Sequence, residues 1–88
     1  MHAVVVSVTL NDRDRATKFL NEEIVPQVSQ APGFVSGVWV SIDGERGRGT
    51  IVFESEEAAR EMAQQIHQQP GEAVTIESID VGEVAATA

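Results

Sequence analysis

Few side chains in this 88-residue chain combine the type and spacing that chemistry requires. It has no cysteine and two histidines, His2 and His67, near opposite ends of the sequence. His67 is a candidate catalytic base because imidazole titrates near neutral pH. The alternative is a solvated residue at a helix C-terminus, where a cationic histidine complements the helix dipole. Without thiolates or a paired-histidine spacing, we expect no metal site.

Arginine and aromatic residues supply the other candidates. Residues 44–49 superficially resemble a phosphate loop, but they lack its Lys-Ser/Thr pair and lie between two predicted strands. Arg48 remains a catalytic candidate, because a guanidinium that reaches across a dimer can clamp a carboxylate. Trp39 could stack on a planar substrate, and the alternative is a place in the core or in a dimer interface. A substrate pocket would be lined by the aromatic residues Trp39, Phe19, Phe34 and Phe53.

The elements that must position these residues follow from hydrophobic patterning. Segments rich in β-branched residues predict strands over 3–10, 34–42, 50–54 and within 73–84, with residues 43–49 as a glycine-rich turn. Three- and four-residue apolar spacing predicts one helix capped near Asp12 and another capped by Ser55. Pro26 should kink the first helix or begin a separate last turn, and Pro70-Gly71 should end the second. Opposite apolar parity within the last strand predicts a bulge near Ser78.

This βαββαβ order predicts a single ferredoxin-like α+β domain over residues 1–88. Its four-stranded antiparallel sheet would have two helices on one face. In the second strand, Phe34, Val38, Val40 and Ile42 share one parity, while Val35, Gly37, Trp39 and Ser41 share the other.

Because residues of both parities are apolar, the sheet face without helices also carries apolar side chains. In a monomer these side chains would be exposed to water. Leaving Trp39, Val35 and Val5 in water would expose an apolar patch, so we expect a homodimer that packs sheet against sheet; which sheet face holds Trp39 stays open. The alternative is a monomer in which Trp39 packs under a loop.

The charge balance excludes several partners. Six Lys and Arg against 14 Asp and Glu give a net charge of -8, too few cations for nucleic acid or an anionic membrane. No apolar run approaches the roughly 20 residues of a membrane span, and the start lacks the features of a signal peptide. We therefore expect a cytoplasmic protein.

Three sequence features carry a resemblance to a known family. They are the late helix proline followed by Pro32-Gly33-Phe34, the strand residues 35–39, and the residues 53–59 that open the second helix. On these the chain resembles the antibiotic biosynthesis monooxygenase-like proteins, which form dimeric α/β barrels. The resemblance implies a dimer and a pocket between sheet and helices. The haem-degrading branch uses an Asn, a Trp and a His, and this chain has a counterpart only at His67, which argues against haem degradation.

Two functions stay open from the sequence. The resemblance implies a cofactor-independent monooxygenase that acts on a planar or hydrophobic metabolite. The alternative is a non-catalytic dimer of the same fold that binds a small hydrophobic ligand or serves as an accessory subunit. A catalyst needs convergent polar groups in a pocket, whereas an accessory dimer needs only its interface.

Overall fold

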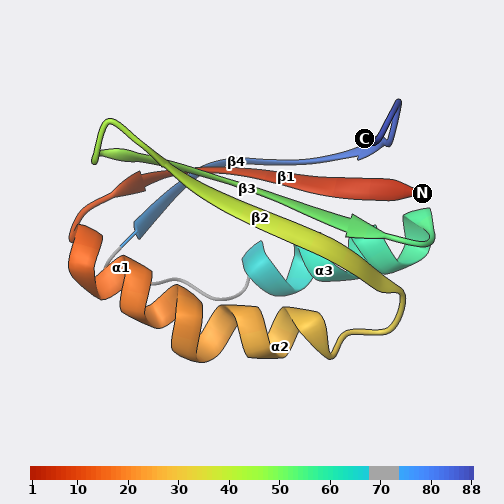
Figure 1. Cartoon of the computed structure of the whole chain (residues 1–88), viewed down its shortest axis with the longest axis horizontal. Helices are drawn as coiled ribbons and strands as arrows, with labels where there is room; N and C mark the ends of the chain where they lie inside the picture. Colours follow the sequence, from red (N-terminus) through yellow and green to blue (C-terminus); the bar gives the residue numbers. More distant parts are fainter. Residues whose placement is uncertain (68–73) are drawn as a thin grey trace.

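The computed structural model describes residues 1–67 and 74–88 of the chain. Its strands, paired antiparallel in the order β2-β3-β1-β4, are β1 (His2–Leu10), β2 (Phe34–Ile42), β3 (Arg46–Phe53) and β4 (Val74–Glu83). Its helical segments are α1 (Arg13–Phe19), η1 (Leu20–Ile24), α2 (Val25–Ser29) and α3 (Glu56–His67). Figure 1 shows all of them on one side of the sheet. The predicted ferredoxin-like fold is confirmed, and the other sheet face, called here the open face, carries no helix of the described chain.

The first helical stretch begins and changes pitch for identifiable reasons. The carboxylate of Asp12 accepts a hydrogen bond from the backbone N–H of Arg15 and caps α1. Pro26 has no N–H to donate back along the helix, and the chain widens just before it. The segment η1 is a π-helix in which the Val25 N–H reaches the Leu20 carbonyl, five residues back. The predicted separate last turn is therefore α2, with Pro26 in its first turn.

The second helix, α3, begins as the sequence predicts. The Ser55 hydroxyl accepts a hydrogen bond from the Ala58 backbone N–H at 3.2 Å. Glu56 and Glu57 then occupy the first turn, where they complement the helix dipole. Pro70-Gly71, the predicted stop, lies outside the described residues.

The core lies between the sheet and the helices. Val4, Ile51 and Phe53 are its largest fully buried side chains, and Phe34 meets Phe53 edge to face with ring centroids 6.2 Å apart. The predicted bulge in the last strand is present, because pairing passes from Ser7–Ser78 to Val8–Ile76 and leaves one extra residue in β4. This extra residue turns the apolar side chains of both halves of β4 toward the helices.

The third strand is longer than predicted. It begins at Arg46, so the turn spans only Asp43 to Glu45, and Asp43 and Gly44 adopt positive φ angles there. Glycines at 47 and 49 weaken the sequence signal for a strand, but both lie on the helix side of the sheet, where neighbouring side chains approach closely. The prediction of a glycine-rich turn over 43–49 was wrong for residues 46–49.

The predicted parity of the second strand was right for Val38, Val40 and Ile42, which share one face, but wrong for Phe34. A bulge between Phe34 and Ser36 reverses the alternation, so Phe34 and Trp39 both face the helices. The side chains that cover the open face of β2 are instead Val38, Val40 and Ile42, which pair with Thr50, Arg48 and Arg46. Val5, paired with Thr50, lies on the open face as predicted.

Candidate functional site

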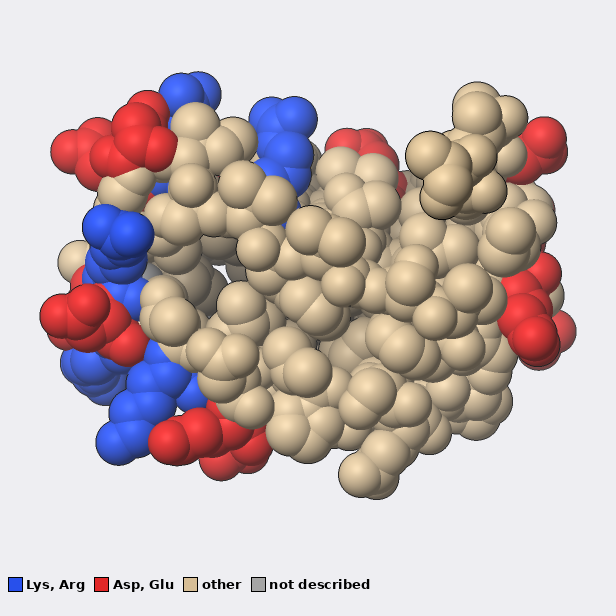
Figure 2. All heavy atoms as spheres, in the orientation of Figure 1, with Lys and Arg blue, Asp and Glu red and all other residues tan. Residues whose placement is uncertain are grey.

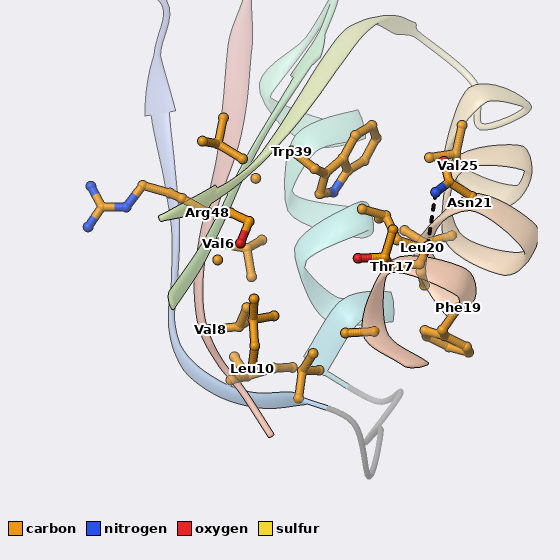
Figure 3. A pocket seen from close by; sticks show the side chains of 18 of the residues that line it. Val6, Val8, Leu10, Thr17, Phe19, Leu20, Asn21, Val25, Trp39 and Arg48 are labelled. Carbon is orange, nitrogen blue, oxygen red and sulfur yellow. Dashed lines mark hydrogen bonds between the residues drawn. The ribbon is translucent and has the colours of Figure 1, made fainter. Parts of the chain in front are cut away.

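A cavity of about 510 Å³ lies between the sheet and the first helical stretch. Figure 3 shows β1 on one side of it, contributing Val6, Val8 and Leu10, and the helical residues Leu20 and Val25 on the other. Most other lining groups are also aliphatic, among them Ala16, Ile24, Ile51, Ile66, Val74 and Ile76. A volume of this size with an apolar lining is typical of sites for small organic ligands.

Trp39 forms one wall of the cavity, and glycines fix its position. An ideal Cβ at Gly49 would lie 2.7 Å from the indole Cδ1, and one at Gly37 would lie 2.8 Å from Cη2. The indole therefore packs over the bare backbone of β2 and β3, where any larger residue would push it away. Gly47 similarly admits Val8 and Leu10, since its Cβ would lie 2.9 Å from Val8 Cγ2. The glycines thus shape the floor of the cavity.

A few polar groups interrupt the apolar lining. Arg13, Thr17 and Asn21 come from the helical side at four-residue spacing, and Ser41 comes from β2. The Asn21 amide donates a hydrogen bond to the Thr17 carbonyl at 3.0 Å, which fixes its orientation (Figure 3). Arg13, Thr17 and Asn21 were not predicted from the sequence as site residues. Their i, i+4, i+8 spacing beside the apolar stripe of the helix was the signal that could have found them.

Two of the four aromatic candidates line the cavity. Trp39 and Phe19 do so, and Phe19 is 41% exposed. Phe34 and Phe53 contact one another in the core beneath the sheet instead. The structure therefore separates the aromatic residues into a cavity pair and a core pair.

The structure does not bring the two catalytic candidates together. Arg48 borders the cavity, but its side chain points away from it (Figure 3), as expected from its pairing with Ser7 on the open face. His67, the last residue of α3, is exposed and borders a second cavity of about 320 Å³ together with Arg60, Gln64 and Ile79. Neither contributes a side chain to the apolar cavity beside Trp39.

Charge is unevenly distributed around the cavity. Five of the six Lys and Arg residues belong to α1 and β3, and Figure 2 shows Lys and Arg spheres, with Asp and Glu between them, near a hollow at the end where α1 begins. Asp43 is paired with Arg46 at 2.9 Å. The hydrogen bond from the Arg46 guanidinium lowers the pKa of the Asp43 carboxyl below its ordinary value. Away from the cavity, Arg60 holds Glu56 at 2.8 Å and lowers the pKa of that carboxyl in the same way.

Two further features of the described residues concern metal-ligand clusters and helices that could span a membrane. Among residues 1–67 and 74–88, no group of three or more His, Asp or Glu side chains is arranged to hold a metal ion. No helix formed by these residues has the length and apolar character needed to cross a membrane.

Comparison with known proteins shows which solved structures share this fold. No family model matches the chain, and no curated protein matches its sequence. Among solved structures, HapK from Hahella chejuensis covers all of this chain and 96% of its own, with a TM-score of 0.68 and 10% identity. A dimeric ferredoxin-like protein from an uncultured marine organism covers all of this chain and 98% of its own, with a TM-score of 0.61 and 13% identity.

The third similar structure is a monooxygenase. It is the product of ActVA-Orf6 of Streptomyces coelicolor, in complex with the ligand nanaomycin D. Its sequence is 18% identical to this chain, and the two structures superpose with a TM-score of 0.56. The match covers 98% of this chain and 91% of the monooxygenase chain. At such identities the likeness defines the fold alone. The resemblance to the antibiotic biosynthesis monooxygenase-like proteins is thus confirmed in the fold of this chain.

Proposed function

We propose that each subunit binds a planar, largely apolar metabolite in the cavity beside Trp39. The observation that carries this proposal is the indole itself, which lies over Gly37 and Gly49 and borders a cavity of about 510 Å³. A flat aromatic wall favours a flat ligand, because offset stacking adds to the gain from burying apolar surface. The aliphatic residues of β1 and η1 cover the rest of such a ligand.

Oxygenation of the bound ligand is the second candidate. It is supported by the shared fold with a monooxygenase and by hydrogen-bonding groups within an apolar cavity, the Asn21 amide and the Ser41 hydroxyl. A suitable reaction converts a methylene flanked by phenol rings into a carbonyl. One oxygen atom of O₂ enters the carbonyl, the other leaves as water with both methylene hydrogens, and four electrons pass from carbon to O₂.

The residues that line the cavity limit the substrates on which that reaction could act. Its described lining includes no carboxylate and no histidine, so the lining offers no ordinary general base. The substrate must therefore be acidic enough to ionise in water before it binds, as polyphenolic ring systems are. Simple binding makes no such demand, and it is the function that the lining supports best.

We also infer that two copies pack through their open faces. On β2, Val38 is 62% exposed, Val40 is 50% exposed and Ile42 is 36% exposed, and Val5 and Val52 lie half-buried on the same face. Contiguous apolar surface of this kind is typical of an interface. A closed two-fold dimer would cover it and leave both cavities on the outer, helical sides. Native mass spectrometry should give twice the subunit mass of 9.5 kDa, and a monomer would contradict the inference.

Tryptophan fluorescence tests the binding proposal, because Trp39 is the only tryptophan and the chain has no tyrosine. Titration with 1,8-dihydroxyanthraquinone should quench the emission and saturate at one molecule per subunit. Val8→Phe narrows the cavity and should weaken binding, whereas Val5→Phe makes the same change on the opposite face of β1 and should not. Equal affinities for the two variants would contradict a cavity site.

Oxygen consumption separates catalysis from binding. With 1,8-dihydroxyanthrone as the probe, an oxygenase should consume O₂ faster than the probe's own autoxidation and form the anthraquinone. The variant Val8→Phe should consume O₂ no faster than the probe's own autoxidation. Binding without excess O₂ consumption would leave the ligand-binding function and exclude oxygenation of this probe.

A further inference from the structure

We propose that the ligand of this cavity is an organic acid whose carboxylate is held by Arg13 at the cavity mouth. This inference rests on the proposed binding function and adds the chemical class of the ligand. It follows from where Arg13, which has no ion pair within residues 1–67 and 74–88, lies relative to an apolar cavity.

Arg13 is the one cation of the described chain that both lines the cavity and has its guanidinium beside the β2–β3 turn. A Cβ on Gly44, in that turn, would lie 3.8 Å from the Arg13 Nη1. Within residues 1–67 and 74–88, no carboxylate forms an ion pair or hydrogen bond with it. The side chain is exposed at the rim and free to receive an anionic group.

The other lining cation does not compete for this role. Arg48 borders the cavity, but Figure 3 shows its guanidinium on the far side of the sheet. Arg46, near the same turn, is already bound to Asp43 through two guanidinium nitrogens, at 2.9 and 3.3 Å. Arg13 is therefore the guanidinium positioned to meet a ligand in this cavity.

The net charge of -8 is not spread evenly over the protein. At the end where α1 begins, residues 11–19 and 43–49 carry five cations and four anions, and Figure 2 shows both signs beside a hollow. This end is therefore close to neutral, so an acid meets less repulsion here than elsewhere, and its apolar body can then enter the cavity. A guanidinium can bind a carboxylate through two parallel hydrogen bonds, which would fix the direction in which the ring system enters.

A pair of probes with one ring system isolates the carboxylate. Rhein carries a carboxylic acid on the 1,8-dihydroxyanthraquinone core, and aloe-emodin carries a neutral hydroxymethyl group at the same position. The wild-type protein should bind rhein about tenfold more tightly, in line with a charge-assisted hydrogen bond. Arg13→Gln should remove that preference, Arg13→Lys should keep part of it, and rising salt should reduce it.

Arg60→Gln is the matched control, because Arg60 lies on α3 in an ion pair with Glu56 and does not line this cavity. It should leave the preference for rhein unchanged. Equal binding of both probes by the wild-type protein, or an unchanged preference in Arg13→Gln, would overturn the inference while leaving the cavity site intact. Binding of neither probe would instead count against the proposed function, so the two failures are distinguishable.

Discussion

Replacing Gly49 with alanine should push Trp39 into the cavity. The new Cβ would lie 2.7 Å from the indole Cδ1 and 2.9 Å from Nε1. To move from 2.7 Å to the ordinary contact distance of at least 3.4 Å, the ring must retreat by about 0.7 Å. The contacted atoms belong to the five-membered ring near the attachment point, so rotation of the far end of the indole cannot relieve the overlap.

The expected cost is moderate and measurable. Overpacking costs about 1–3 kcal/mol, and replacing a strand glycine by alanine returns about 0.5–1 kcal/mol through the unfolded state. We expect a net loss of about 1 kcal/mol in the free energy of unfolding. In a domain of this size that lowers the Tm by about 4–8 °C. Affinity for 1,8-dihydroxyanthraquinone should fall several-fold, since the displaced ring occupies the ligand's space.

Two comparisons make this test specific. Gly82→Ala is the control for the backbone effect, because its Cβ would meet nothing within 4 Å and should be neutral or stabilising at matched subunit concentration. In a Trp39→Leu background, Gly49→Ala should lose its cost, because the atoms that it would overlap are gone. Thermal unfolding followed by circular dichroism reports all four variants. If Gly49→Ala matched the wild type in both Tm and affinity, the position assigned to the indole would be refuted.

Three further predictions concern the interface, a helix cap and a hairpin. Val38→Asp should convert the dimer to a 9.5 kDa species in native mass spectrometry, because it places a charge on the open face; a persistent dimer would contradict sheet packing. Ser55→Ala should lower the unfolding free energy in guanidinium chloride by about 1 kcal/mol, because α3 loses its cap; an unchanged midpoint would contradict the role of that hydrogen bond. In a carbon-detected NMR titration, the Asp43 carboxyl should titrate below its ordinary pKa of 3.8, and Arg46→Gln should raise its midpoint. Because the folded pKa is lowered, the pair stabilises the hairpin above the unfolded pKa and loses that effect as pH falls through the folded value; an unmoved midpoint would show that the pair does not form in solution.

Local signals in the sequence were sufficient for the order of elements. Asp12 and Ser55 cap their helices because short polar side chains accept hydrogen bonds from first-turn N–H groups. Asp43-Gly44 forms the hairpin turn because both positions require positive φ. The reversed parity in the last strand correctly indicated its bulge. Each of these features depends on a few adjacent residues.

The site was harder to predict because it depends on contacts between distant segments. The bulge after Phe34 has no compositional mark, yet it moves Trp39 to the helix side and Val38 to the open face. Gly49 reads as a turn residue in sequence, and its role is visible only once the indole of a neighbouring strand lies over it. The bulge also decides which side chains form the open face, because Val38 lies there and Trp39 does not, although an apolar open face that includes Val5 was correctly expected.

Methyl NMR of the ligand-bound protein would test the central claim most directly. Val6 and Val8 face the cavity, while Val5 and Val38 lie on the open face of the same sheet, so valine methyl groups distinguish the two sides. With rhein bound, intermolecular NOEs should reach the methyls of Val6 and Val8 and the Trp39 indole. NOEs confined to Val5 and Val38 would mean that the ligand binds the open face, and the cavity would lose its proposed function.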